Sequence, residues 1–351
     1  MSDPTRVAVI LVNHKDYAGK YLPECYKSLM EQTYPKDQMT LFIADNETTE
    51  KSRALIERIV PNARLIPNTE NLGWAGGNNT AIRVALAEGF DYLVMLNMDT
   101  HLDKEWLHQL IKQAEENKDL HILQSKILIY GTQRVNSLGN RIQYLGYGYC
   151  NGYGQPDTAP RRFPMDFASG AAMLIKQEVF KKIGFFHDEY FMYCEDTEFC
   201  WRARLAGFNV GLAEKSVCYH KYNFLNVMNS LYYVERNRLL TLLTLEKWGT
   251  LLLILPCLAL VQAGSLVYFT WRGYGKPMGR LILYFLKPKT WKWIAAQRHR
   301  VHPLRIRKDA EIVRRFAGAV VFAEIANPFF GFFINPLLWT YWMIARMLIF
   351  W

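Results

Sequence analysis

The first hundred residues alternate apolar runs with segments of helical spacing, and this alternation restricts the fold more than any other feature of the chain. The apolar runs cover residues 7–13, 41–44, 63–67 and 92–96, and the helical segments between them cover residues 21–32, 49–59 and 75–88. Strands that alternate with helices at this interval pair in parallel and are joined by crossover helices. The sequence therefore predicts an α/β fold built on a parallel sheet.

Polar side chains follow three of the predicted strands. These side chains are Asn13 and His14, Asp45 and Asn46, and Asn97 and Asp99. Ligands of open α/β sheets bind at the carboxyl ends of the strands, so three polar clusters at one edge indicate a site of nucleotide size. A carboxylate at that edge can anchor a divalent cation that carries a diphosphate. For the last cluster an alternative stays open, in which Asp99 or Thr100 caps a helix that starts near Asp103.

A glycine-rich segment, residues 68–79, connects the third strand to the next helix. Gly76 and Gly77 stand at the predicted helix start, where the backbone can approach a ligand and the first amides can face a phosphate. The segment has neither the Lys and Ser or Thr of a P-loop nor a GxGxxG pattern. In the alternative interpretation, the glycines only allow the helix to pack closely.

The second half of the first 245 residues is less regular. Residues 134–162 predict a loop or irregular hairpin, 167–175 a strand, and 177–183 a short helix. An aromatic run then meets three acids, Glu195, Asp196 and Glu198, at the start of another helix. One of these carboxylates is a candidate general base. A negatively charged first turn with Arg202 and Arg204 as helix partners also explains Glu195 and Glu198, but it explains Asp196 less well.

Taken together, the motifs resemble family 2 glycosyltransferases of the GT-A fold, and most of all the bacterial rhamnosyltransferase branch. The matching motifs occur in the family's order over roughly residues 5–245. They are Asp45-Asn46, the segment 71–79, Leu96-Asn97-Met98-Asp99, Ser169-Gly170-Ala171, Glu195-Asp196 with the following Arg202 and Arg204, and Tyr219-His220. The resemblance implies a Rossmann-like domain that binds a nucleotide sugar of the dTDP or UDP type.

The resemblance also implies roles for single residues. Asp45 would accept a hydrogen bond from the pyrimidine base, and Asn13 would line the same pocket. Gly76, Gly77 and Asn78 would belong to the donor site. Asn97-Met98-Asp99 would be the DxD element, in which Asn97 replaces the first Asp, so that Asp99 is the expected ligand of Mg²⁺ or Mn²⁺. His220 would be a further metal ligand.

The implied reaction is an inverting transfer with Asp196 as its base. Trp74, Glu195 and Arg202 are expected to support the site. An inverting transfer needs no covalent intermediate, so no Ser, Cys or Lys nucleophile is expected. Asp196 would remove the proton of the incoming hydroxyl on the face of the sugar opposite the leaving diphosphate.

The last hundred residues indicate contact with a membrane. Residues 249–271 and 325–345 form uncharged runs of 23 and 21 residues, and aromatic residues gather at their ends. Between them, residues 272–315 hold 13 Lys or Arg and two acids, whereas the rest of the chain is close to neutral. Because the basic stretch lies between membrane-type segments, nucleic acid is not the expected partner. Pro256 and Gly264 favour a re-entrant or in-plane hairpin over full spans, with the basic stretch on anionic headgroups.

We therefore expect a GT-A catalytic domain at 1–245 and a helical membrane-associated region at 246–351. The six cysteines lack paired spacing, and no apolar signal segment starts the chain, which favours a reducing cytosol. The expected acceptor is a lipid-linked glycan of cell-surface polysaccharide synthesis, used at the cytoplasmic face of the cell membrane. Two alternatives stay open: a polysaccharide synthase, although a multi-helix channel and a Gln-x-x-Arg-Trp element are missing, and a non-catalytic scaffold or nucleotide sensor.

Overall fold

The computed structural model describes residues 5–158, 163–320 and 330–351. Its contacts divide the chain into two compact units. The first falls within Met1–Asn140, Cys150–Cys200 and Phe208–Tyr222, and the second within Arg141–Tyr149, Trp201–Gly207 and Asn223–Trp351. The two units are described separately below.

The first unit is built on strands and the helices that connect them. The strands are β1 (Val7–His14), β2 (Met39–Asn46), β3 (Arg64–Pro67), β4 (Tyr92–Leu96), β5 (Thr100–Leu102), β6 (Ile122–Ile129), β7 (Val135–Ser137), β10 (Ala172–Lys176) and β11 (Val210–His220). The helices are α1 (Tyr17–Met30), α2 (Glu50–Ile59), α3 (Gly73–Ala87), α4 (Trp106–Glu116) and α5 (Gln177–Ile183), and α6 (Glu195–Leu205) continues from this unit into the second.

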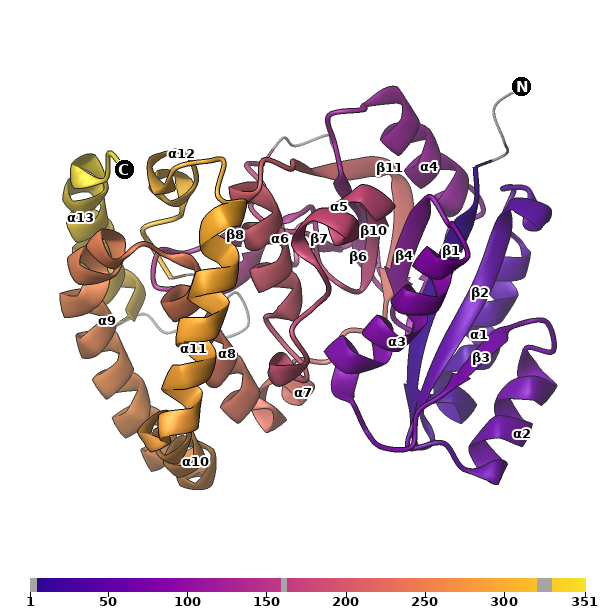
Figure 1. The fold of residues 1–351 in the computed structure, drawn as a ribbon, viewed down its shortest axis with the longest axis horizontal. Helices are drawn as coiled ribbons and strands as arrows, with labels where there is room; N and C mark the ends of the chain where they lie inside the picture. The colour runs from indigo at the N-terminus through magenta and orange to yellow at the C-terminus, as the bar shows by residue number, and fades with distance from the viewer. Residues whose placement is uncertain (1–4, 159–162, 321–329) are drawn as a thin grey trace. The chain divides into compact units, whose positions relative to one another are not determined.

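Within the described residues, nine strands form one mixed sheet of order β3-β2-β1-β4-β10-β6-β11-β5, and β7 pairs with β6. The pairs β1–β2, β2–β3 and β1–β4 are parallel, as the alternating sequence predicts, and Figure 1 shows β1 between β2 and β4. Beyond β4 the sheet changes direction, because β10 runs antiparallel to both β4 and β6. The strands from β3 to β4, which carry the polar ends, are therefore parallel to one another. The part of the sheet beyond β4 is mixed.

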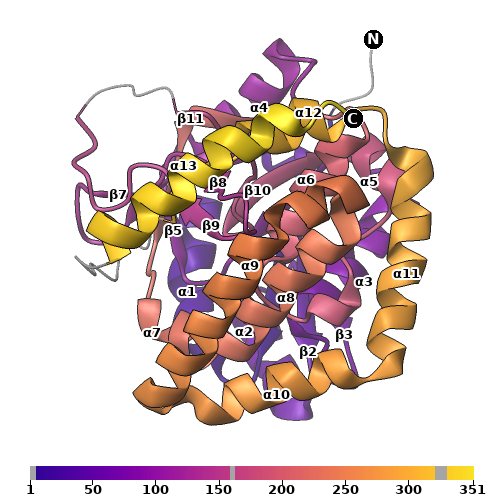
Figure 2. The ribbon, with the colours of Figure 1, turned by 90° about the vertical axis from the view of Figure 1, so that its left-hand side faces the viewer.

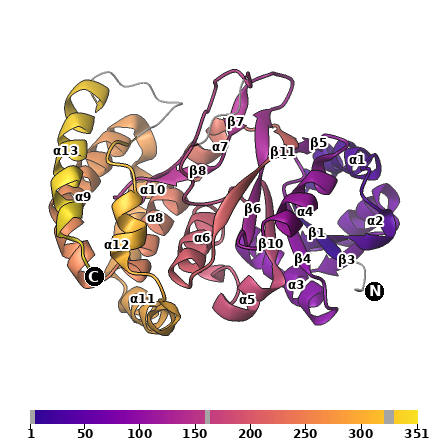
Figure 3. The same ribbon diagram turned by 90° about the horizontal axis from the view of Figure 1, so that it is seen from above.

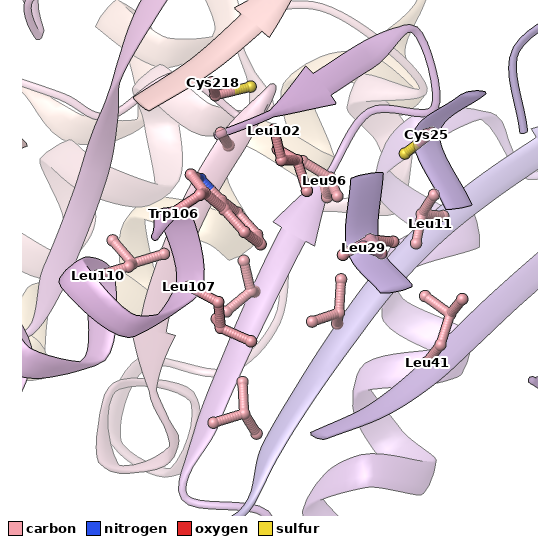
Figure 4. Packing of buried hydrophobic residues seen from close by; sticks show 14 of the residues in the cluster. Leu11, Cys25, Leu29, Leu41, Leu96, Leu102, Trp106, Leu107, Leu110 and Cys218 are labelled. Carbon is pink, nitrogen blue, oxygen red and sulfur yellow. The ribbon is translucent and has the colours of Figure 1, made fainter. Parts of the chain in front are cut away.

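The core of the first unit lies between the sheet and the helices α1 and α4. Val9 and Leu11 of β1 point to this face and pack with Leu29 of α1. Trp106 and Leu107 of α4 close the same cluster, as Figure 4 shows. Helix α3 lies on the other side of β1 and β4 (Figure 3). Burial of both faces explains why these strands read as continuous apolar runs.

Several predicted segments have different bounds in the structure. The predicted strand 167–175 is β10, which begins only at Ala172 and ends at Lys176. The strand that follows α6 is β11, which runs from Val210 to His220. Residues 134–162 contain β7 and a hairpin of β8 (Asn140–Ile142) with β9 (Gly148–Cys150), and residues 159–162 lie outside the described part.

The helix-cap interpretation of Asp99 and Thr100 is wrong. Thr100 begins β5, and α4 starts at Trp106 with Glu105 as its first flanking residue. The residues after β4 are therefore a turn between two strands rather than a helix start.

The second unit is mostly helical. Its helices are α7 (Phe224–Asn229), α8 (Leu231–Leu245), α9 (Trp248–Phe269), α10 (Gly275–Leu286), α11 (Pro288–Val301), α12 (Asp309–Ile312) and α13 (Asn335–Ala345). Figure 2 shows α9 running beside α8, with α10 across one end of both. The second uncharged run of the sequence, 325–345, is described only from Phe330 onward, where α13 occupies most of it.

Helix α9 contacts other parts of the second unit at several points along its length. Gln262 of α9 accepts a 2.6 Å hydrogen bond from Arg238 of α8, and Leu266 and Phe269 contribute to an apolar cluster with Leu231 of α8. Among the described residues, one helical stretch, Trp248–Leu286, is long and apolar enough to cross a membrane, and only 22% of its most apolar part is buried. Gly273, at φ +92°, turns the chain between α9 and α10.

Candidate active site

The turn between β4 and β5 carries Asn97, Met98 and Asp99. The Thr100 hydroxyl donates a 2.7 Å hydrogen bond to the Asn97 carbonyl and closes this turn. Strand β5 pairs antiparallel with the end of β11, in a register that places His220 opposite Thr100. Asp99 Oδ1 consequently lies 3.3 Å from His220 Nε2. The pairing of these two strands thus brings together two predicted metal ligands that are far apart in the sequence.

The electrostatics of this pair favour an ionised carboxylate. Burial alone would raise the pKa of Asp99, but the hydrogen bond and charge of His220, together with a hydrogen bond from Tyr17, hold that pKa below its ordinary value. Burial, reinforced by the negative charge of Asp99, raises the pKa of the Tyr17 hydroxyl. Tyr17 therefore stays neutral and donates to Asp99.

The residues of this pair fit a divalent cation that is held jointly with a substrate. Apart from the ion pair, Asp99 Oδ1 and His220 Nδ1 are buried atoms without a hydrogen-bond partner in the described part of the chain. A carboxylate and an imidazole suit Mn²⁺, and the carboxylate also suits Mg²⁺. In the same described part, no group of three or more His, Cys, Asp and Glu side chains is arranged to hold a metal. The protein would supply two ligands, and diphosphate oxygens and water would supply the others.

Asn97 is engaged by Trp74, the second residue of α3. Trp74 Nε1 donates a 3.0 Å hydrogen bond to Asn97 Oδ1. An indole N–H is only a donor, so the oxygen of the amide must face Trp74 and the amide nitrogen must face elsewhere. One of the two lone pairs of this oxygen is therefore already used by Trp74.

Asp196 stands in the first turn of α6 and is held by two backbone N–H groups. Gly170 N donates to its Oδ2 at 3.0 Å, and Thr197 N donates to its Oδ1 at 2.7 Å. Desolvation by the surrounding protein nevertheless raises the pKa of Asp196 above its ordinary value. Burial, and then the charge of Asp196, raises the pKa of the buried Glu195 well above its ordinary value. Burial thus disfavours a charge on Glu195 more than on Asp196, so the negative charge of the pair falls preferentially on Asp196.

The backbone that leads into α6 is conformationally unusual. Phe191, Tyr193 and Cys194 have φ angles of +63°, +64° and +63°. Non-glycine residues in this region cost of order 1–3 kcal/mol each and persist where the surrounding structure imposes them. The Phe191 carbonyl accepts the Ala75 N–H at 3.1 Å and lies where a Cβ at Gly73 would be, so this segment is held by the start of α3.

Asn13 and Asp45 meet at the carboxyl ends of β1 and β2. Asn13 Nδ2 donates a 2.6 Å hydrogen bond to Asp45 Oδ1, and the Ser52 hydroxyl donates to Oδ2 at 2.7 Å. Both oxygens of the buried Asp45 are therefore engaged by protein donors. The contact to a base that the family resemblance implies for Asp45 stays a prediction.

Gly76, Gly77 and Asn78 lie buried in the first turns of α3. A Cβ at Gly77 would lie 2.7 Å from Val12 Cγ1, and one at Gly76 would lie 2.7 Å from Leu72 Cβ. Asn78 donates to the Trp74 carbonyl at 2.8 Å. These contacts match the close-packing interpretation of the glycines, and their role in donor binding stays a prediction.

Sequence reasoning assigned no role to several residues that hold the site. Ser52 and Tyr17 carried no distinguishing pattern, and the Gly170 N–H was part of a recognised motif without an assigned contact. Arg202, expected to support the site, is buried further along α6 and belongs to the second unit. Its role stays a prediction, as do those of the other candidate residues.

Residues 8–184, half of the chain, match the family described as Glycosyl transferase family 2, and the chain therefore belongs to that family. The family expected from the motifs is thus confirmed. A solved structure of similar fold is the mannosyltransferase PcManGT from Pyrobaculum calidifontis, in complex with GDP-Man and Mn²⁺. The superposition covers 86% of each chain at 15% identity, with a TM-score of 0.51. At this identity the likeness shows the fold alone, and it confirms the expected GT-A fold.

Two curated relatives are similar over more than half of the chain. The low-salt glycan biosynthesis hexosyltransferase Agl10 of Haloferax volcanii is 27% identical over 58% of this chain and 64% of its own length. The N-acetylglucosaminyl-diphospho-decaprenol L-rhamnosyltransferase of Mycobacterium tuberculosis is 25% identical over 52% of this chain and 67% of its own length. The chain thus spans about two thirds of the length of these relatives.

Proposed function

We propose that this protein transfers a sugar, with a rhamnose-like sugar favoured, from a nucleoside diphosphate of the dTDP or UDP type to a hydroxyl of a lipid-linked glycan. The observation that carries the proposal is the 3.3 Å contact of Asp99 with His220 at the carboxyl edge of the sheet. The family supports the reaction class. The Mycobacterium relative is named as an L-rhamnosyltransferase that acts on N-acetylglucosaminyl-diphospho-decaprenol. This name supports both the lipid-linked acceptor and the rhamnose-like sugar.

In this proposal Asp99 and His220 hold Mg²⁺ or Mn²⁺. The bound ion would act as a Lewis acid that stabilises the leaving diphosphate. Asp196 accepts the proton of the acceptor hydroxyl, which is worth roughly 10²- to 10⁴-fold in rate. Its two backbone hydrogen bonds fix the direction of the carboxylate. Attack opposite the leaving group then gives inversion.

The second unit is proposed to lie on the cytoplasmic face of the membrane without crossing it. Helix α9 is tied at Gln262 to Arg238 of α8, and Arg238 forms a 2.8 Å ion pair with Glu235. If α9 spanned the bilayer, these charged groups would enter the hydrocarbon region beside it, which costs several kcal/mol. An in-plane position leaves the exposed side chains of α9 and α10 in the acyl boundary. In this proposal residues 1–245 form the catalytic domain and residues 246–351 form the membrane-associated region.

A donor panel tests the reaction. Purified protein is incubated with dTDP-rhamnose, UDP-glucose, UDP-N-acetylglucosamine and GDP-mannose, each with a polyprenyl diphosphate-linked acceptor, with and without Mn²⁺. We expect metal-dependent transfer from one donor, with an inverted anomeric centre by NMR. Asp196→Asn should lower turnover at least 100-fold while nucleotide binding persists. A scaffold or sensor would instead show no turnover with any donor, and retention of configuration would exclude the role of Asp196.

A further inference from the structure

The indole of Trp74 touches both halves of the candidate reaction centre. On one side its Nε1 donates to Asn97 Oδ1 at 3.0 Å. On the other side its six-membered ring lies against Gly170, where a Cβ would be only 2.7 Å from Cζ2 and 2.8 Å from Cη2. The N–H of this same glycine donates to Asp196 Oδ2. Trp74 is therefore a physical connection between the residue that replaces the first Asp of the DxD element and the candidate base.

The surroundings of Trp74 leave its ring little freedom. Its carbonyl accepts the Asn78 amide at 2.8 Å, and its ring meets Phe186 edge-on with a centroid distance of 5.2 Å. The next residue, Ala75, is tied through its N–H to the Phe191 carbonyl. Trp74 is thus held both at its backbone and at the edge of its ring. Any displacement of the ring would disturb all of these contacts together, so the ring can fix the orientation of its neighbours.

The chemistry of the Asn97 contact also limits what Asn97 can do. Because Trp74 can only donate, the Asn97 oxygen faces the indole, and the amide nitrogen, with its two N–H donors, is turned away from it and can face a ligand. The nitrogen is a neutral donor, suited to an oxygen of an anionic diphosphate and unsuited to a cation. This arrangement accounts for an amide at a position where the DxD element has a carboxylate.

We propose that Trp74 is a positioning residue, which turns the Asn97 amide nitrogen toward a diphosphate oxygen of the donor and holds Gly170 against Asp196. The inference rests on the proposed function. Asn97 is then a hydrogen-bond donor to the substrate, and Asp99 alone supplies the acidic metal ligand from this turn. Gly170 has no side chain because the Trp74 ring occupies the space that a Cβ would need.

A double-mutant cycle of Trp74→Phe and Gly170→Ala tests the inference. Trp74→Phe removes the indole N–H and the two ring atoms that face Gly170. We expect it to weaken binding of the nucleoside diphosphate with Mn²⁺, and to lower kcat/KM, by about three- to tenfold each, as for one lost hydrogen bond. Gly170→Ala in the wild-type background should cost at least tenfold in kcat, and it should shift the acid limb of the pH profile upward because the N–H leaves Asp196.

The kcat of the double variant decides whether the Trp74 ring and Gly170 are coupled. With a phenyl ring at position 74, the added methyl group at position 170 has room, so we expect the double variant to have nearly the kcat of Trp74→Phe alone. Binding is measured by calorimetry with UDP, dTDP or GDP, whichever the wild type binds with Mn²⁺, and kcat with the donor found in the panel. Equal losses from Gly170→Ala in both backgrounds would overturn the inference. So would wild-type nucleotide binding and turnover in Trp74→Phe.

Trp106→Phe is the matched control, since Trp106 also donates its indole N–H, to Ser125 at 2.8 Å, but lies in the apolar core. It should lower the melting temperature without changing the pH profile or the ratio of kcat to KM. If Trp74→Phe behaved in the same way, Trp74 would be a structural residue only. A wild-type protein that neither binds nucleotide nor turns over would refute the proposed function instead, so the two failures are distinguishable.

Discussion

At the scale of single residues, one acid, Asp99, supplies the negative charge of the turn between β4 and β5. Asp99 keeps a pKa below its ordinary value, with His220 and Tyr17 as partners. Asn97 faces Trp74 with its oxygen. One negative charge is therefore available to a cation in this turn, where a DxD element has two.

Replacement of Asp99 and of Asn97 should have unequal effects. Asp99→Ala removes the acidic ligand, and we expect kcat to fall at least 100-fold together with the Mn²⁺ dependence of nucleotide binding. Asn97→Asp keeps an acceptor for Trp74 but loses the amide N–H proposed to face the diphosphate, so turnover should fall by at most about tenfold, as for one lost hydrogen bond. Both effects are measured by steady-state kinetics and by calorimetry with Mn²⁺.

Asp103→Ala is the matched control for this pair, since Asp103 is an exposed acid directly after β5 whose side chain accepts the Glu105 N–H at 3.0 Å. Its kinetics should match those of the wild type. Equal damage from Asn97→Asp and Asp99→Ala would contradict the division of roles.

The raised pKa of Asp196 predicts the pH dependence of the reaction. A base must be deprotonated to accept a proton, so activity is lost as the pH falls through the pKa of Asp196. Because desolvation raises that pKa above its ordinary 3.8, the acid limb of kcat/KM should lie above this value. The limb should keep its position when Mg²⁺ replaces Mn²⁺, since it does not belong to a metal-bound group. An acid limb at or below 3.8 would show that another group controls it.

At the scale of elements, the pairing of distant strands assembles the site. Strand β5 has only three residues, but its pairing with β11 carries His220 to Asp99. In a similar way β10 places the Gly170 turn beside α6, because it enters the sheet between β4 and β6. Short strands of this kind are stabilised by their neighbours rather than by their own propensity.

Helices α9 and α10 present an apolar surface of their own. Exposed side chains along them are Leu252, Leu255, Leu260, Val267, Trp271, Ile282, Leu283 and Leu286. Lys276, Arg280, Lys287 and Lys289 stand in or next to α10. Exposed apolar residues beside clustered Lys and Arg are typical of helices that lie in a membrane interface.

Leu286→Ser should therefore weaken binding to anionic vesicles about tenfold, as expected from the loss of one buried leucine side chain. Ile306→Ser is the matched control, because Ile306 and Leu286 are both 70% exposed but Ile306 lies outside α9 and α10. Binding is measured by co-sedimentation with phosphatidylglycerol vesicles, and with neutral vesicles for comparison. Equal losses in the two variants would show that membrane contact does not depend on α10.

At the scale of the whole molecule, the chain joins a GT-A unit to a helical unit that takes residues from three separated segments. The alternating pattern predicted the parallel strands β1 to β4 well, because a continuous apolar run and a helical period of 3.6 residues are local properties that can be read directly from the sequence. The polar ends of those strands indicated the edge at which the candidate site lies. The family motifs indicated which family the chain belongs to.

The sequence by itself thus determined the fold class, the family and the candidate residues, since each depends on local patterns or on short motifs. Only the tertiary structure decided which of these residues meet. The Asp99–His220 contact depends on the register of β5 with β11, and the contacts of Trp74 with Asn97 and Gly170 depend on how the start of α3 packs against the turns after β4 and before β10. Such contacts join residues far apart in the chain, and no local pattern records the geometry of packing that forms them.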